Sequence, residues 1–443
     1  MLHVVRAAWL AGLALLCFSP GALAQAEPAA PPNVILCMTD DQGWGDVSYN
    51  GLKAIKTANL DAMAAASLRL DRFYAAAPVC SPTRGSVLTG RHPNRFGCFL
   101  YGHPLRTQEQ TVAQALRSAG YVTGHFGKWH LNGVSGPGKV IRADDPLSPG
   151  AFGFDEWLSV TNYFDLDWTL SRKGTPEKFT GDGSDYIVGE ALKFTAQTAQ
   201  RKKPFLAVIW FGSPHDPHRA LPDDLKTANG SAYHGEILAL DRAMGKLRGE
   251  LRQQGLADDT LVWFCSDNGA TGPGSTGGLR GKKGSVWEGG VRVPGLVEWP
   301  ARIRKPFASA VPACTSDIYP TLLDLIGVKV ANPVQPLDGI SLQSLFDGKL
   351  TERPQPIGFW HYPGQPAAFG KNGGQVAWTE NQYKLVRLMA DKYELYDLKN
   401  DPNEKHDLSA EKPDEMARMK KALDAWQDSV LKSYRGEDYP AKK

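Results

Sequence analysis

Two short apolar segments of the chain end abruptly in oxygen-bearing side chains. The run Asn33–Met38 leads, after one threonine, into the pair Asp40-Asp41, and the run Thr260–Cys265 leads, after one serine, into Asp267-Asn268. Adjacent carboxylates repel each other, and a hard cation relieves that repulsion because Ca²⁺ and Mg²⁺ take carboxylate and amide oxygens as ligands. The first pair alone would also suit an acidic turn that caps a helix. Two such pairs favour a metal site, and ligation by oxygen alone favours Ca²⁺ or Mg²⁺ over Zn²⁺.

Cys80 stands in an unusual segment. It opens the run Cys80-Ser-Pro-Thr-Arg84, and a Leu-Thr-Gly-Arg sequence follows at Leu88–Arg91. The spacing places Arg84 one helical turn after Cys80. The simplest interpretation of these residues is a thiol near a helix N-terminus, with a cation close by.

The candidate metal ligands must be held in place by helices and strands, which the sequence pattern also predicts. Short, almost wholly apolar runs with β-branched residues are typical of strands buried on both faces. Apolar residues at helical spacing, ending at a glycine, predict helices between them. The alternation predicts an α/β fold in which a large, mostly parallel sheet is sandwiched by helices. The expected strands are Asn33–Met38, Pro204–Phe211, Thr260–Cys265 and, more weakly, Gly290–Glu298, and the expected helices are Thr111–Ala119, Tyr233–Gln254 and Asp317–Gly327.

The pattern changes after about residue 350. Gln375–Arg387 and Lys392–Leu398 have the alternation of antiparallel strands, and Glu411–Ser433 is a long helical pattern that closes the chain. We therefore expect a main domain over residues 33–350 and a smaller C-terminal α+β domain, an antiparallel sheet with a closing helix, over residues 351–443.

The first 26 residues have the pattern of a cleaved export signal. Arg6 supplies the positive charge, Ala7–Phe18 the apolar core, and small residues near Ala24 a cleavage site. The apolar run is too short to span a bilayer, and no later segment is apolar enough to do so. The sequence thus predicts an exported protein, periplasmic or secreted, without a membrane span.

Composition and charge exclude several other classes. The 443 residues carry a formal net charge of +3 with no long run of one sign, which argues against nucleic acid or an anionic membrane as the main partner. Removal of the signal, which holds Cys17, leaves five scattered cysteines. An odd count in an exported protein leaves at least one thiol unpaired or chemically special.

The segment around Cys80 resembles the maturation signature of type I sulfatases, in the alkaline phosphatase superfamily. In that family the cysteine of Cys-x-Pro-x-Arg is oxidised to Cα-formylglycine. The resemblance extends over nearly the whole mature chain, since further family motifs follow in the same order. They are Asp40-Asp41, Gly127–Leu131, Pro214–Pro217, Asp267–Gly269, Lys283–Gly290, and Tyr396–Leu398 with Asp401–Glu404.

The resemblance implies an alkaline-phosphatase-like fold and a set of site residues. Asp40, Asp41, Asp267, Asn268 and the modified Cys80 would bind the cation, Ca²⁺ in preference to Mg²⁺. The aldehyde at Cys80 would hydrate to a gem-diol, whose hydroxyl attacks sulfur and forms a covalent sulfate ester. The other catalytic residues implied by the motifs are Arg84, Lys128, His130, His215 and Lys283.

Each of these residues has an implied role. Arg84 would hold the gem-diol and the metal-site carboxylates, while Lys128 and Lys283 would clamp the sulfate, whose charge requires fixed cations. Lys282 competes with Lys283 for this role, but Lys283 has the family spacing. His215 is expected to protonate the leaving alcohol as general acid, and His130 to act as the base that restores the aldehyde.

The resemblance therefore implies a sulfuric ester hydrolase of the arylsulfatase type. The expected substrate is a sulfated carbohydrate, such as a glycosaminoglycan or polysaccharide fragment, or an aryl sulfate, and the expected partner is a formylglycine-generating or sulfatase-maturating enzyme. Two alternatives stay open at this point: a phosphomonoester or phosphonate hydrolase on the same site, and an inactive carbohydrate-binding homologue. His218 and His361 are further candidates for substrate contact.

Overall fold

The computed structural model describes residues 31–389 and 392–440. The predicted signal segment, residues 1–26, lies outside this part of the chain. The described residues from Pro32 onward form one compact unit, and the predicted domain boundary near residue 350 stays a prediction.

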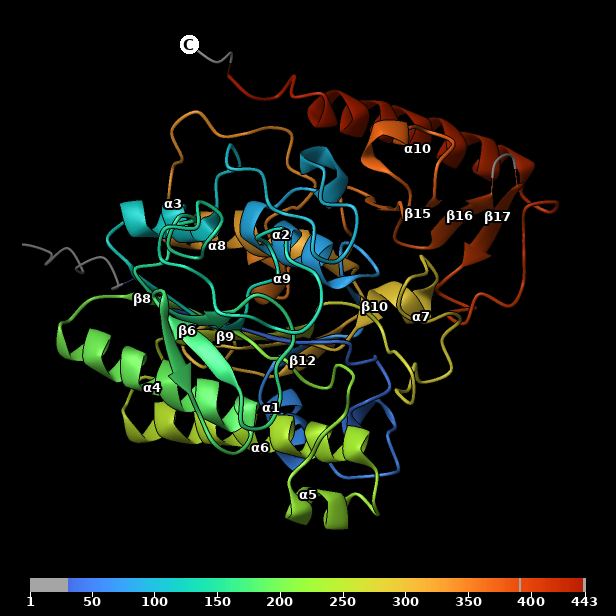
Figure 1. The fold of residues 1–443 in the computed structure, drawn as a ribbon. Coiled ribbons are helices and arrows are strands. Elements are labelled where there is room, and N and C mark those ends of the chain that lie inside the picture. Colours follow the sequence, from blue (N-terminus) through green and yellow to red (C-terminus); the bar gives the residue numbers. More distant parts are fainter. Residues whose placement is uncertain (1–30, 390–391, 441–443) are drawn as a thin grey trace, which may run out of the picture. The chain divides into compact units, whose positions relative to one another are not determined.

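The largest element is a ten-stranded sheet with the order β12-β2-β11-β9-β1-β8-β4-β5-β6-β7 (Figure 1). Its five central strands, from β9 to β5, are parallel, whereas β11, β6 and β7 join antiparallel. The predicted mostly parallel sheet is confirmed at the centre, and its edges are mixed. The strands are β1 Asn33–Thr39, β2 Leu68–Leu70, β4 Val122–Lys128, β5 Glu156–Val160, β6 Thr169–Arg172, β7 Thr175–Lys178, β8 Phe205–Trp210, β9 Thr260–Ser266, β11 Gly295–Glu298 and β12 Phe307–Ser309.

Helices cover both faces of this sheet, as predicted (Figure 1). Alternate residues of β1 enter different cores: Leu36 packs in the cluster that contains α2, α3 and α8, and Ile35 packs in the cluster that contains α1, α4 and α6. This alternation follows from the two-residue period of a strand. The helices are α1 Ala58–Ala64, α2 Cys80–Thr89, α3 Val112–Ser118, α4 Gly183–Gln200, α5 Pro222–Thr227, α6 Ala232–Gln253, α7 Glu288–Val291, α8 Ile318–Ile326 and α9 Gln343–Phe346.

The C-terminal part forms a separate four-stranded antiparallel sheet, β14-β15-β16-β17, packed against the long helix α10 (Figure 1). The antiparallel sheet and the closing helix are as predicted, but the predicted strand Gln375–Arg387 is divided into β15 and β16, which pair with each other. The elements are β14 Ile357–His361, β15 Gln375–Thr379, β16 Tyr383–Met389, β17 Lys392–Asp397 and α10 Pro413–Tyr434. We call residues 351–440 the C-terminal subdomain.

The segment Gly290–Glu298, predicted as one weak strand, is divided. Its start belongs to α7, and Pro294 separates β10, Arg292–Val293, from β11. A proline cannot donate a ladder hydrogen bond, so the strand cannot run through it. β10 instead pairs with β3, Phe73–Tyr74, in a small three-stranded sheet completed by β13, Ala313–Cys314.

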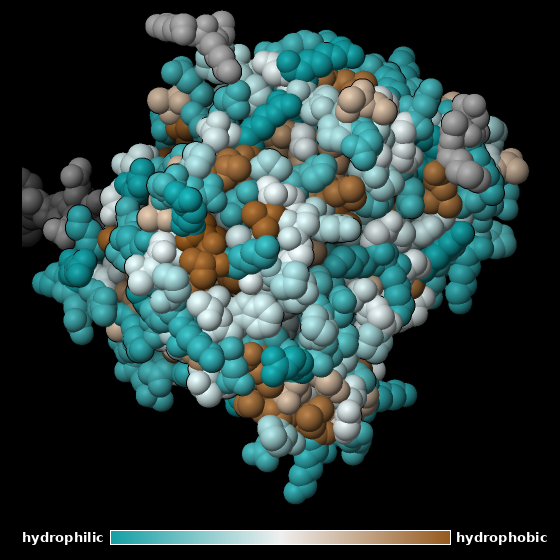
Figure 2. Space-filling view, in the orientation of Figure 1, coloured by the Kyte–Doolittle hydropathy of each residue, from teal (hydrophilic) through white to brown (hydrophobic). Residues whose placement is uncertain are grey.

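The described surface is that of a polar protein. The face in Figure 2 is mostly hydrophilic, with apolar residues in separated patches. Within residues 31–389 and 392–440, Tyr101 is the one large apolar side chain that is well exposed, at 53%. In the same residues, no helix has the length and apolar character needed to cross a bilayer, and the five cysteines are buried and free.

Candidate active site

The two polar pairs predicted at strand ends meet at one edge of the main sheet. β1 and β9 are parallel neighbours with Thr39 opposite Ser266, so the residues after them emerge side by side. The Asp41 backbone N–H donates to Oδ1 of Asp267 at 3.1 Å, and Nδ2 of Asn268 donates to Oδ1 of Asp41 at 2.7 Å. The carboxyl ends of parallel strands are where α/β sheets bind ligands.

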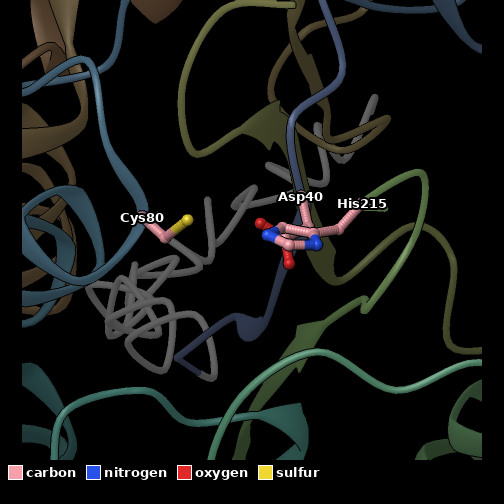
Figure 3. A group of neighbouring side chains, drawn as sticks. All are labelled: Asp40, Cys80 and His215. Carbon is pink, nitrogen blue, oxygen red and sulfur yellow. The ribbon is translucent and has the colours of Figure 1, made fainter. Parts of the chain in front are cut away.

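Cys80 is brought to this edge by α2, of which it is the first residue. Ligand atoms of Cys80, Asp40, Asp41 and Asp267 all lie within 4.8 Å of one another, and Cys80, Asp40 and His215 form a second such group. In Figure 3 the Cys80 thiol points toward the Asp40 carboxylate and the His215 ring, which come from separate segments of the chain. Side chains that are up to 227 positions apart in the sequence, from Asp40 to Asp267, thus lie together in one small volume.

The residues of this group fit a hard cation. Three carboxylates and one carboxamide are fully buried together. Oδ1 of Asp40 and Oδ1 of Asn268 have no hydrogen-bond partner, although both atoms are buried. Buried acceptors without a partner are costly, and a cation with oxygen ligands would satisfy both.

Three cationic side chains surround the same carboxylates. The guanidinium of Arg84 lies 2.6 Å from Oδ2 of Asp267 and 3.6 Å from Oδ1 of Asp40. Lys128 donates to Asp40 at 2.6 Å and Lys283 to Asp41 at 2.7 Å. The site therefore combines oxygen ligands for a cation with fixed positive charges for an anion.

The two neighbouring lysines, Lys282 and Lys283, differ in what they contact. Lys283 reaches the metal-site candidate Asp41, whereas Nζ of Lys282 donates to the backbone oxygens of Gly272 and Gly274. Of the two lysines, Lys283 is therefore the one that contacts the candidate cation site.

The electrostatics of the site reflect this crowding. Burial alone would raise the pKa of Asp40, but Lys128, His215 and Arg84 hold it below its ordinary value. Burial and the neighbouring Asp40 raise the pKa of Asp267. Burial raises the pKa of the Cys80 thiol to about 12. An unmodified thiol here is thus protonated at neutral pH and is a poor nucleophile.

His130 lies just after β4 and beside Lys128. Its backbone has a φ of 56°, in the left-handed region, and its ring is buried with no partner for either nitrogen. Burial, then the charges of Lys128 and Arg84, lower its pKa well below the ordinary value. The imidazole is therefore neutral, and both of its nitrogens are free of hydrogen bonds within the site.

His215 lies in the loop after β8, at the rim of the site. Its Nδ1 is within hydrogen-bond distance of the Asp216 carbonyl oxygen, and because a carbonyl only accepts, Nδ1 carries a proton. Its Nε2 lies 3.8 Å from Oδ2 of Asp41. Nε2 is therefore the nitrogen that faces the site and can exchange a proton there.

Two aromatic residues of the site were not predicted. Tyr163 stacks on His215 with ring centroids 4.7 Å apart, and Trp210 lies under the guanidinium of Arg84 at 5.1 Å. Neither residue stands in a motif that identifies it. Trp210 ends the apolar run of β8 beside β1, which is the only sequence signal that could have indicated it.

The two further histidine candidates differ in position. His218 lies 3.5 Å from Oε2 of Glu236, and that contact raises its pKa. His361 ends β14 and is buried, and burial lowers its pKa to about 4.

Comparison with known proteins gives matches over most of the chain. A family model described as Sulfatase matches residues 32–328, and a second, described as N-sulphoglucosamine sulphohydrolase, C-terminal, matches residues 281–429. N-acetylgalactosamine-6-sulfatase of Canis lupus familiaris is 31% identical over 380 residues, 77% of this chain and 71% of that protein. Human arylsulfatase A is 32% identical over 374 residues, 76% of this chain and 72% of that protein.

Solved structures agree with these matches. The crystal structure of Ps i-CgsB has a TM-score of 0.81 and 28% identity, and the match covers 90% of this chain and 93% of that one. The same protein was also solved in complex with k-i-k-neocarrahexaose. Because the family model covers well over half of the chain and the relatives share its site-bearing region, the chain belongs to the sulfatase family, in the alkaline phosphatase superfamily, and is a sulfuric ester hydrolase.

Proposed function

We propose that the protein hydrolyses sulfate monoesters of saccharides, with a formylglycine made from Cys80 and a bound Ca²⁺. The observation that supports this proposal is the arrangement around Cys80. Three buried carboxylates lie together there, and each is paired with a fixed cationic side chain. A site with these two components can hold a divalent cation and a sulfate anion side by side.

Asp40, Asp41, Asp267 and Asn268 would hold the cation, together with an oxygen of the modified Cys80. The unpartnered oxygens of Asp40 and Asn268 support this assignment. A bound Ca²⁺ would supply positive charge where negative charge develops on the reacting oxygens.

Cys80 would be converted by a maturating enzyme, and the hydrated aldehyde supplies a hydroxyl nucleophile that a thiol cannot provide. Arg84 lies one helical turn later and bonds Asp267 at 2.6 Å. Its contacts keep the nucleophile position and the carboxylates of the metal site in a fixed relation.

Lys128 and Lys283 would bind the sulfate oxygens. Each donates to one aspartate of the Asp40-Asp41 pair, so both ammonium groups lie at the edge of the cation site. Fixed donors of this kind require no reorganisation as charge develops in the transition state.

Two histidines would move the protons. His215, whose Nε2 faces the site, would protonate the leaving alcohol. His130, whose two buried ring nitrogens have no hydrogen-bond partner, would take up the proton of the second hydroxyl at Cys80.

The substrate class is inferred from the relatives. Those matched over most of their length include an N-acetylgalactosamine-6-sulfatase and a structure solved in complex with k-i-k-neocarrahexaose. The family model described as N-sulphoglucosamine sulphohydrolase, C-terminal, matches residues 281–429. We further propose that residues 1–26 direct export, so that the enzyme meets its substrate in the periplasm or outside the cell.

Sulfate release from a defined panel tests the proposal. The matured enzyme is incubated with Ca²⁺ and sulfated mono- and oligosaccharides, 4-nitrophenyl sulfate, a phosphomonoester and a phosphonate monoester. We expect release of sulfate from at least one saccharide, with a higher kcat/KM than for either phosphorus ester. Turnover of aryl sulfate but of no saccharide would contradict the substrate class, faster turnover of a phosphorus ester would favour the phosphohydrolase, and no turnover would favour a binding protein.

A further inference from the structure

The segment Arg280–Gly290 carries Lys283 and lies between the active site and the C-terminal subdomain. On the active-site side, the backbone N–H of Lys283 donates to Ala270 at 3.0 Å, and that of Gly284 donates to Pro78 at 2.9 Å. These two acceptors stand close in sequence to Asn268 and to Cys80. The segment is thus attached directly to the loops that supply the metal site and the nucleophile.

The other side of the segment is held by buried charges of the C-terminal subdomain. Nζ of Lys384 lies 3.0 Å from Oε1 of Glu288 and 2.9 Å from Oε1 of Glu404. The second oxygen of Glu404 accepts the backbone N–H of Glu288 at 2.7 Å, and the Tyr74 hydroxyl donates to Glu288 at 3.0 Å. The side chains of Lys384 and Glu288 are fully buried.

Close backbone packing connects Glu288 to Lys283. A Cβ added to Gly290 would lie 2.0 Å from the Ser285 carbonyl oxygen and 2.6 Å from that of Lys282. The N–H of Gly289 donates to Arg280 at 2.7 Å. The segment therefore folds back on itself without space between its two ends, and a shift of Glu288 moves the backbone that carries Lys283.

A second contact links the same segment to the C-terminal subdomain. Arg280 stacks on Trp287 at 3.7 Å and donates to the Tyr396 hydroxyl at 2.9 Å and to the Glu404 carbonyl oxygen at 3.0 Å. Glu404 is thus bonded to the segment near both of its ends.

We propose that Lys384 and Glu404 are positioning residues for Lys283, so that the C-terminal subdomain sets the geometry of the sulfate-binding site. This inference rests on the proposed role of Lys283 in binding sulfate. Buried ion networks contribute little net stability, because desolvation of the charges offsets their attraction. A geometric role gives a physical reason for burying a lysine between two glutamates far from solvent.

Arg95 offers a matched control. It is buried, and it bonds Asp338 with its Nε at 2.7 Å and, through Ser433 at 2.8 Å, helix α10 of the C-terminal subdomain. None of these partners lies in the segment Arg280–Gly290. Its removal should weaken the attachment of the C-terminal subdomain without reaching Lys283.

The test compares matured wild-type enzyme with Lys384→Met, Lys384→Arg and Arg95→Met. Melting temperature, kcat, KM and the inhibition constant of inorganic sulfate are measured for each. We expect Lys384→Met to raise the inhibition constant and KM about tenfold, which corresponds to a loss of about 1.4 kcal/mol of binding. Lys384→Arg should recover part of this loss, and Arg95→Met should lower the melting temperature while leaving sulfate inhibition within about twofold of wild type.

Unchanged sulfate inhibition in folded Lys384→Met, with a lower melting temperature like that of Arg95→Met, would overturn the proposal. If Lys384→Met does not fold, Glu404→Gln removes one charge at nearly constant shape and should raise the inhibition constant in the same direction. If the wild-type enzyme releases no sulfate from any substrate, and inorganic sulfate does not raise its melting temperature, the proposed function itself is contradicted. The two failures are therefore distinguishable.

Discussion

The ring of Tyr163 lies nearly parallel to that of His215, with centroids 4.7 Å apart and an interplanar angle of 12°. The stack holds the plane of the imidazole ring in place, and the contact of Nδ1 with the Asp216 carbonyl oxygen sets how the ring is rotated within that plane. Nε2 is left facing the site. A proton donor is effective only when it is held within reach of the atom that it protonates.

Replacing Tyr163 with leucine should therefore impair protonation of the leaving group. We expect kcat for a sugar sulfate, whose alcohol is a poor leaving group, to fall about tenfold or more, within the range of general acid catalysis. The rate for 4-nitrophenyl sulfate, whose leaving group needs no proton, should change much less. Tyr163→Phe keeps the ring and serves as the control. Equal losses for both substrates would show that the stack does not act through proton transfer.

Removal of the cation should abolish activity and lower stability. The carboxylates of Asp40, Asp41 and Asp267 are buried together, so we expect the cation to bind only the folded state. A ligand of that kind raises the free energy of unfolding by about 2.7 kcal/mol at a hundredfold excess over its Kd. We expect Ca²⁺ to raise the melting temperature of chelator-treated enzyme and to restore its activity. In Asp267→Asn the calcium-dependent rise should shrink. A melting temperature that does not respond to Ca²⁺ or Mg²⁺ would argue against the cation site.

Gly290→Ala should disturb the segment that carries Lys283. Its new Cβ would lie 2.0 Å from the Ser285 carbonyl oxygen, so the backbone must shift. Gly249, in α6, has open space at its Cβ position, and Gly249→Ala should stabilise the helix by about 0.5–1 kcal/mol. Kinetic constants of the two variants, measured beside their melting temperatures, should show raised KM and weaker sulfate inhibition only for Gly290→Ala. Normal sulfate inhibition in Gly290→Ala would mean that the segment tolerates the shift.

The contact between Arg95 and Asp338 should make stability depend on pH. Burial alone would raise the pKa of Asp338, but Arg95, by charge and hydrogen bonds, holds it well below its ordinary value. A lowered pKa in the folded state contributes stability above the unfolded pKa, about 3.9 for aspartate, and this stability is lost as pH falls through the folded pKa. The melting temperature of wild type should therefore exceed that of Asp338→Asn most at neutral pH, and the difference should decrease below pH of about 4. A difference that does not vary with pH would contradict this account.

Local patterns in the sequence were sufficient to predict β1, β8 and β9, but not the other two central strands, β4 and β5. The strand Asn33–Thr39 and the strand Thr260–Ser266 are continuous apolar runs, and their polar ends predicted the metal site. In contrast, β4 contains Gly124, His125 and Gly127, which interrupt the apolar pattern, so the strand was not predicted although it carries Lys128. Its place in the sheet depends on pairing with β8 and β5, which local sequence does not encode.

The candidate site shows the same division. Cys80, Lys128, His215 and Lys283 are brought together by the fold, and motif resemblance had indicated each of them. The contacts of Tyr163 with His215 could not be predicted, because they join residues far apart in sequence by packing alone. The catalytic roles assigned to Cys80, Lys128, His215 and Lys283 stay predictions, which the experiments above test.

The proposed activity depends on the conversion of Cys80 to the nucleophile of a sulfatase. The most direct test is the mass of the peptide that contains Cys80, from protein co-expressed with a maturating enzyme and assayed for sulfate release. We predict a loss of about 18 Da at Cys80, the difference between a thiol and an aldehyde side chain, and loss of activity in Cys80→Ala. An unmodified Cys80 in protein that releases sulfate at full rate, or a Cys80→Ala variant that stays active, would contradict the account.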